Sequence, residues 1–414
     1  MKKILILLLA IGLTLPGIHA QNENERYFII SGVVKNKANK KKMESVSVTI
    51  TGTGIGTVTN EDGEFSLKIS ETTQATSIEF SFVGFYNNRV SIDKNALNHE
   101  TYFMTPKPKN LKEITVVGWT DPAKLVLEAI KKIEVNYSPI PNLLTGFYRE
   151  TAQKRKNYIN IAEAVIQIYK TKYTDDIYHD RVQIQKGRKL LSAKAGDTLA
   201  VKLLGGPNLS LTIDLVKNRE LLFNIDNLDY YRFTMEEMTL IDDRLHFVVS
   251  FDPQVVLPYA LFYGRFFIDA HSLSFTRAEF SLDMKDKNKA TDLILRRKPA
   301  GLRFNPEEVA FVISYKQRDS ITYLNYVRNE IRFKCDWKKR LFATNYTIVS
   351  EMVVTNNQTH DAVPIQRKEG FDIHNSLSDK VGNFYDDDFW GAYNIIEPSE
   401  SLESAVNKLK KGYR

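Results

Sequence analysis

Residues 46–67 read VSVTITGTGIGTVTNEDGEFSL, and this stretch decides the fold of the N-terminal part of the chain. In residues 46–50, valine and isoleucine alternate with serine and threonine, which is the period-two pattern of a half-buried strand. Glycines at positions 52, 54 and 56 lie between extended runs, where turns need positive φ angles. The Asp62-Gly63 pair is typical of a hairpin turn. We therefore expect several short strands in a small antiparallel β-sandwich.

The same alternation recurs on the C-terminal side of this stretch, in residues 65–69 and 78–82. Together with Gly32-x-Val34 upstream and Phe82-Val83-Gly84-Phe85 downstream, the pattern resembles the carboxypeptidase regulatory-like domain, a transthyretin-like β-sandwich. The resemblance covers about residues 27–105. It implies an accessory module that carries no catalytic residues of its own.

The first twenty residues have the composition of a secretory signal peptide. Lys2 and Lys3 precede a short apolar run, and the small residue Ala20 stands before polar Gln21. The apolar run is too short to span a bilayer. We therefore expect export to the periplasm, association with the outer membrane and no transmembrane helix in the mature chain.

The larger second part of the chain is predicted to be one sheet. Between residues 143 and 354, long extended runs follow each other with short connections, which indicates a large, curved antiparallel sheet. Asp121 is expected to cap a helix that begins at Pro122 and ends near residue 136. Residues 208–218 and 255–263 are also expected to be helical. A last amphipathic helix is expected to follow Ser399.

This part looks like the lipoprotein-carrier type of open β-barrel, in which a glycine-led strand such as residues 264–272 precedes a long hairpin. It also resembles uncharacterised bacterial envelope proteins that join a regulatory-like sandwich to such a sheet, through residues 144–150 and 388–398. The expected fold class is mainly β, a small antiparallel β-sandwich followed by a large curved antiparallel sheet (an open half-barrel) with a few helices. The expected divisions are a signal peptide (1–20), a sandwich (21–106), a linker strand (107–118), the curved sheet domain (119–369) and a C-terminal loop and helix (370–414).

The remaining motifs exclude several classes of function. The histidines form neither His-Glu-x-x-His nor His-x-x-Glu, and Gly205-Gly206-Pro207 is not followed by the Lys-Ser/Thr of a phosphate loop. The single cysteine, Cys335, shares a strand face with apolar neighbours and is expected in the core. We therefore expect no catalytic residue, metal site or cofactor. Loss of Lys2 and Lys3 lowers the formal net charge from +7 to +5, and the basic residues are dispersed, so no nucleic-acid partner is expected.

Abundant aromatic residues in the sheet region leave two alternatives open. The rings either pack into a core or line a cavity that admits an apolar ligand, with Phe247, Phe251 and Phe266 as the expected lining. Our leading hypothesis is a non-enzymatic envelope protein, with the sandwich as a docking module and the sheet binding an apolar ligand, a lipid or an outer-membrane protein. The alternatives are a glycan-binding or structural accessory protein, and a hydrolase associated with metallocarboxypeptidases.

Overall fold

The computed structural model describes residues 26–92, 99–108, 119–197, 199–203, 205–337, 342–358, 362–383 and 389–411. The predicted signal peptide, and residues 109–118 of the predicted linker strand, lie outside these residues. Strands dominate the described part, which also contains six α-helices, and the predicted fold class is confirmed.

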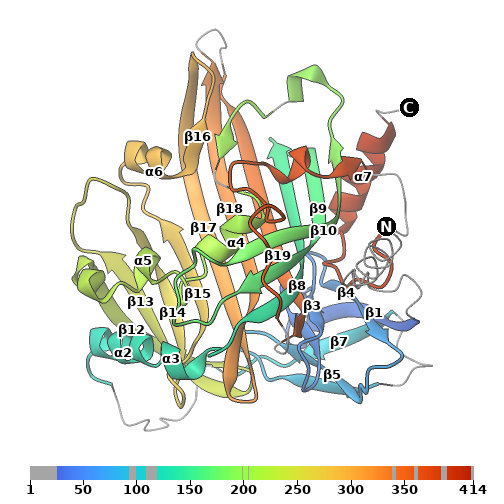
Figure 1. Ribbon diagram of the computed structural model, residues 1–414, viewed down its shortest axis with the longest axis vertical. Coiled ribbons are helices and arrows are strands. Elements are labelled where there is room, and N and C mark those ends of the chain that lie inside the picture. Colours follow the sequence, from blue (N-terminus) through green and yellow to red (C-terminus); the bar gives the residue numbers. More distant parts are fainter. Residues whose placement is uncertain are drawn as a thin grey trace, which may run out of the picture.

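The N-terminal module consists of two small sheets that face each other (Figure 1, blue). One sheet has the order β4 (Glu64–Ser70), β1 (Tyr27–Asn36), β7 (Glu100–Met104). The other has the order β3 (Gly56–Val58), β2 (Ser47–Ile50), β5 (Ser77–Ser81), β6 (Asn88–Ser91). The pairs are antiparallel except for β7, which runs parallel to β1. Phe65, Phe80 and Tyr102 pack in the core between the two sheets.

The predicted turn between β3 and β4 is confirmed. Gly63 has a φ of +70°, and a Cβ at this position would lie 2.7 Å from the carbonyl oxygen of Val34. The carboxamide oxygen of Asn60 accepts hydrogen bonds from the backbone N–H groups of Asp62 and Glu64, both at 2.9 Å. The backbone therefore requires glycine at 63, and the side chain of Asn60 closes the turn.

A single sheet of eleven strands forms most of the second part. Its order is β12 (Tyr231–Ile241), β13 (Arg244–Pro253), β14 (Phe262–Asp269), β15 (Phe275–Leu282), β17 (Leu302–Arg318), β18 (Ile321–Trp337), β19 (Thr344–Gln358), β8 (Asn142–Lys154), β9 (Asn157–Lys170), β10 (Arg181–Leu191), β20 (Gly382–Asn383). All pairs are antiparallel except β10 with β20. Strands β12 and β20 are the two edges, so the curved sheet is open, as predicted (Figure 1).

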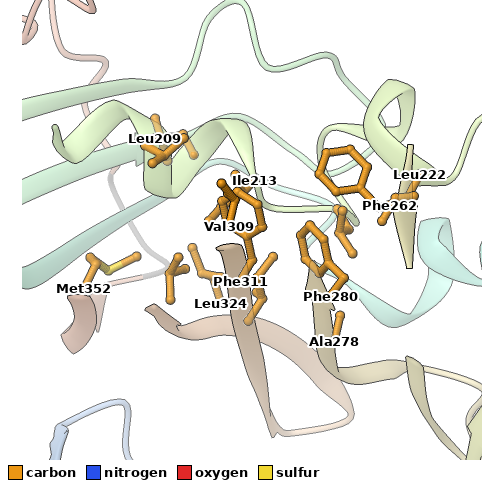
Figure 2. Packing of buried hydrophobic residues seen from close by; sticks show 14 of the residues in the cluster. Leu209, Ile213, Leu222, Phe262, Ala278, Phe280, Val309, Phe311, Leu324 and Met352 are labelled. Carbon is orange, nitrogen blue, oxygen red and sulfur yellow. The ribbon is translucent and has the colours of Figure 1, made fainter. Parts of the chain in front are cut away.

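Helices cover one face of this sheet, which we call the inner face. They are α2 (Pro122–Lys131), α3 (Ile133–Asn136), α4 (Pro207–Thr212) and α5 (Arg219–Leu222). The first begins as predicted, because the carboxylate of Asp121 accepts hydrogen bonds from the N–H groups of Ala123 and Lys124. In Figure 2, Leu209 of α4 and Ile213 lie above Val309 and Phe311 of β17, within the main hydrophobic core.

The sequence misjudged three helical segments. Of residues 208–218, only 208–212 are helical, as part of α4, and a loop follows in which Asp214 turns inward to Lys170. Residues 255–263 form no helix, because Pro258 lacks an N–H group and its ring would clash with the preceding turn. The unpredicted α6 (Lys287–Ile294) is capped by Asp286 and packs on β17 near the short pair of β11 (Lys202–Leu203) and β16 (Leu295–Arg297).

The N-terminal module lies against the opposite, outer face of the large sheet. Strand β3 contacts β19, and Val58 joins a hydrophobic cluster with Phe147, Tyr326 and Val353. Residues 389–398, here named the C-terminal strap, complete this cluster with Trp390, whose ring meets that of Phe147 at 5.3 Å. The sandwich, the strap and the large sheet therefore share one apolar contact.

Polar contacts fix the strap on both sides. Arg149 of β8 donates to the carbonyl oxygens of Ile396 at 2.6 Å and Glu397 at 3.3 Å, and it pairs with the buried carboxylate of Glu163 at 2.8 Å. Towards the sandwich, the carboxamide of Asn394 bonds both the N–H and the carbonyl of Lys68, at 2.7 and 3.0 Å. Helix α7 (Glu400–Lys411) follows the strap and is capped by Ser399, as predicted.

Candidate functional site

The loop between β13 and β14 forms an open groove with a volume of about 230 Å³. Most of its lining comes from the apolar residues of the loop, and charged side chains of α6 and of the segment that joins β15 to α6 lie on one side. We call it the 253–261 groove. Its lining residues are Pro253, Gln254, Val255, Val256, Leu257, Tyr259, Ala260, Leu261, Asp283, Lys285, Asp286 and Lys289.

Backbone hydrogen bonds hold this loop at both ends. The backbone N–H and the carboxamide of Gln254 donate to the carbonyl oxygens of Tyr230 and Asp229, and Asp283 donates its N–H to Leu261. Between these anchors, Val256 is 90% exposed and Tyr259 is 51% exposed. The loop thus keeps large apolar side chains in solvent, an arrangement that costs free energy unless something covers them.

The floor of the groove belongs to the main core of the protein. Ala260 and Leu261 are buried in that core, and the next residue, Phe262, packs edge-on against Phe280 at 5.5 Å. Figure 2 shows Phe262 between Leu222 of α5 and the ring of Phe280. An apolar molecule in the groove would therefore touch the surface of the inner-face core directly.

The predicted lining residues lie in the same core. Phe251 and Phe266 stack at 4.3 Å, and Phe223, which follows α5, meets Phe266 at 5.1 Å. Phe247 is also buried in this cluster. Phe251 stands two residues before Pro253, at the end of the strand that leads into the groove. The structure thus gathers the three predicted residues in the buried core, none of them lines the 253–261 groove, and their role as a cavity lining stays a prediction.

A second cluster of chemically active groups is closed to solvent. Lys170 is 1% exposed, and its ammonium lies 2.8 Å from Asp214 and 3.4 Å from Asp180. Burial acts to lower the pKa of Lys170, but the two carboxylates outweigh it and raise that pKa above its ordinary value. Tyr315 donates to Asp214 at 2.7 Å. These groups are buried, so they are not open to a substrate. Their contacts instead hold the loop after α4 on the large sheet.

Lys217, in the same loop, donates to the hydroxyl of Thr171 at 2.7 Å and to backbone carbonyls beside it. Burial lowers the pKa of Lys217 to about 8, against the attraction of Asp180. The ammonium of Lys217 therefore has several hydrogen-bond acceptors, but its removal from water still disfavours the charged form.

The histidines of the described chain do not converge. His246 is buried, its Nδ1 lies 2.9 Å from the carbonyl oxygen of Arg244, and burial lowers its pKa. His179 is exposed, and His360 lies outside the described residues. Within the described ranges, no group of three or more His, Cys, Asp or Glu side chains is placed to hold a metal ion. In the same ranges, every helix is too short or too polar to cross a bilayer.

The position of Cys335 was predicted correctly. The thiol is buried in the main core beside Ile331 and Phe333, and this burial raises its pKa to about 11. A thiol with such a pKa is almost wholly protonated at neutral pH and is a poor nucleophile.

Comparison with known proteins supports the N-terminal assignment. A family model described as the CarboxypepD_reg-like domain matches residues 30–116. The predicted regulatory-like module is thereby confirmed, and the match covers only that part of the chain. No curated protein sequence matches this one.

Two solved structures are similar to part of the chain. One, from Vibrio parahaemolyticus, is named as an outer membrane lipoprotein-sorting protein domain; it is 10% identical, with a TM-score of 0.29, over 59% of this chain and 96% of that chain. The other, a DUF1329 family protein from Desulfovibrio piger, is 11% identical, with a TM-score of 0.25, over 59% and 95%. Both TM-scores are below 0.5, so this likeness carries no conclusion about function.

Sequence reasoning missed the groove because residues 255–263 were expected to be helical. The signal was present in Pro253-Gln-Val-Val-Leu-Pro258, where two prolines bracket three consecutive apolar residues. Such a run cannot continue a helix through Pro258, and it is too short for a buried strand between two prolines. Once a helix and a buried strand are excluded, the remaining interpretation of residues 253–258 is an exposed apolar loop.

Proposed function

We propose that the chain is a non-enzymatic protein of the bacterial envelope, exported to the periplasm and associated with the outer membrane. Its large sheet binds the acyl chain of a lipid or a similar apolar ligand, and its sandwich is a docking module. The observation that carries this proposal is the 253–261 groove, whose exposed wall is apolar and whose floor is the main core.

The chemistry of the groove suits an amphiphile. Val255, Val256 and Leu257 offer apolar contacts to a hydrocarbon chain, and each buried methylene contributes about 0.8 kcal/mol to binding. On the other side, Lys285 pairs weakly with Asp283 at 3.6 Å, and Lys289 with Asp286 at 4.0 Å. A polar head group can rest among these solvated charges while the chain lies on the apolar wall.

The sandwich supports a docking role through its own architecture. The sheet of the sandwich that contains β5 and β6 contacts the large sheet at the turn between β12 and β13. There the N–H of Asn87 donates a hydrogen bond to the carboxylate of Asp243. The far sheet, with β7 at its edge, leaves Phe103 exposed and available to an outer-membrane protein.

Ligand binding can be tested with a fluorescent long-chain fatty acid and with mass spectrometry of lipids that co-purify from native membranes. The key variant is Val256→Asp, because this side chain is exposed in the free protein and would be covered only on binding. Burying a carboxylate against a hydrocarbon chain is costly, so we expect the fatty acid to bind about tenfold more weakly or worse. The melting temperature should not change.

The matched control is Val363→Asp, which places the same charge at another valine that is 71% exposed. It should bind the fatty acid like the natural chain. Equal affinities of the two variants, or a purified protein without any co-purifying amphiphile and without affinity for the probe, would refute the proposal.

A further inference from the structure

A second cavity lies between the sandwich and the large sheet, away from the 253–261 groove. It is bounded by the glycine-rich turn after β2 on one side and by the β17–β18 hairpin on the other, and its volume is about 270 Å³. We call it the interunit cleft. A smaller cavity of about 40 Å³ continues it between the two units, since Lys316 and Asn325 line both.

The wall of the cleft is rich in hydroxyl and carboxamide groups. The sandwich contributes Thr49, Thr51 and Thr53. The large sheet contributes amides, among them Asn325, which is the extra residue where the pairing of β17 with β18 shifts between Ser314 and Tyr315. Such a β-bulge redirects a side chain that a regular ladder would place elsewhere. The cleft can therefore offer many donors and acceptors to one polar ligand.

Three of the five charged side chains that line the cleft, Glu79, Arg89 and Lys316, are already paired with one another. Glu79 is held by Arg89 at 2.5 Å and by Lys316 at 3.5 Å. The side chain of Arg318, in contrast, forms no ion pair or hydrogen bond with any residue that the structure describes, and the exposed Asp319 that follows it is likewise without an ion pair among those residues. Its guanidinium lies 5.1 Å from the ring centroid of Tyr323, a cation–π contact that orients it.

An unpaired acceptor stands beside this unpaired cation. The side-chain oxygen of Asn357 is buried and has no hydrogen-bond partner within the described ranges. Gly54 lies against both side chains, because a Cβ at this position would lie 2.6 Å from a guanidinium nitrogen of Arg318 and 2.9 Å from Cβ of Asn357. Only glycine lets the turn approach both side chains, and each keeps unused hydrogen-bonding capacity.

We propose that the interunit cleft binds a saccharide that carries a carboxylate or phosphate group. Arg318 holds the anionic group in a bidentate manner, and Asn357 accepts a hydrogen bond from a neighbouring sugar hydroxyl. The remaining sugar hydroxyls bond Asn325 and the hydroxyls of Thr49 and Thr51, which accept hydrogen bonds from Lys316 and Ser77 and can still donate. A simple inorganic anion would leave most of the volume and of these polar groups unused, and the lining is too polar for a hydrocarbon chain.

The test is calorimetric titration of the full chain with glucuronic acid, glucose 6-phosphate, glucose and inorganic phosphate. We expect at least one anionic sugar to bind at least tenfold more tightly than glucose and than inorganic phosphate. Preference for glucuronic acid would identify a carboxylate ligand, and preference for glucose 6-phosphate a phosphate ligand. The variant Arg318→Gln should weaken binding of the preferred sugar by about tenfold or more, since a charged hydrogen bond is lost.

Two further variants make the result decisive. Arg332→Gln removes an exposed arginine of the neighbouring strand, β18, and should leave binding unchanged. Asn357→Asp keeps the shape of the side chain but repels an anion, and it should abolish binding without lowering the melting temperature. Equal affinities for glucose and both anionic sugars, binding of inorganic phosphate as tight as that of the sugars, or full binding by Arg318→Gln would overturn the proposal.

Discussion

Replacement of Arg149 by methionine should loosen the C-terminal strap. Methionine keeps much of the apolar stem of arginine and removes its charge and all its donors. The change deletes the ion pair with Glu163 and the hydrogen bonds to the carbonyl oxygens of Ile396 and Glu397. The variant therefore removes the hydrogen bonds from Arg149 to the strap and leaves the apolar contact of Trp390 with Phe147 in place.

The expected loss follows from the burial of these groups. Arg149 and Glu163 are 6% and 3% exposed, and removing one partner of a buried ion pair costs about 3–5 kcal/mol. Glu163 retains Arg188 at 2.9 Å, so its carboxylate stays compensated and the lower end of that range applies. Stranding the carbonyl oxygen of Ile396 adds about 1 kcal/mol or slightly more. We expect the free energy of unfolding to fall by about 3–4 kcal/mol.

Urea denaturation of the full chain measures this loss, and amide hydrogen exchange reports on residues 389–398 separately. The strap amides should lose protection in the variant, whereas those of β17 and β18 should keep it. Arg332→Met is the matched control, because Arg332 is 54% exposed and its surface ion pairs contribute less than about 1 kcal/mol. A loss below about 1 kcal/mol for Arg149→Met, or unchanged exchange in the strap, would refute the reasoning.

Two other predictions concern buried titratable groups. Cys335→Ala should lower the free energy of unfolding by about 1 kcal/mol and leave ligand binding intact, and the natural thiol should react with a thiol reagent at neutral pH only after denaturation. For Lys217, whose folded-state pKa of about 8 is below its unfolded value, the unfolded chain binds the extra proton above about pH 8, so stability should rise with pH between about pH 8 and pH 9. Above about pH 9 the thiol of Cys335, whose folded-state pKa of about 11 is above its unfolded value, offsets this rise. Lys217→Met should abolish the rise, and a variant that keeps it would contradict the assignment. Above about pH 10, stability should fall in both proteins, because burial raises the pKa of Tyr137 and Tyr315 in the folded state.

The local structure of the sandwich could be predicted because it depends on short-range patterns. Alternation in residues 46–50 and 65–69 sets which side chains face the core, and Gly63 sets the turn between β3 and β4. The parallel pairing of β7 with β1 could not be predicted from such short-range patterns. It joins Gly32 to Glu100, and the intervening strands belong partly to the other sheet.

The contact between the two units was beyond sequence reasoning for a similar reason. Val58 has the pattern of a sandwich core residue, yet its side chain belongs to the cluster on the outer face of the large sheet. The hydrogen bond from Thr57 to the carbonyl of Ile395 spans 338 residues of sequence, and no periodicity encodes such a pair. The interunit cleft depends on this placement, so its residues could not be grouped beforehand. The boundary expected at 107–118 lies mostly outside the described residues and stays a prediction.

The strap also affects how the protein behaves at high concentration. Strand β4 is an edge of its sheet, and the outward N–H and carbonyl of an edge residue invite pairing with a strand of another molecule. At Lys68 the carboxamide of Asn394 takes both groups, as a neighbouring strand would. One side chain, held by the fold itself, thus occupies the place where a second copy could begin to add. Release of the strap would expose these two groups of β4 as a template for self-association.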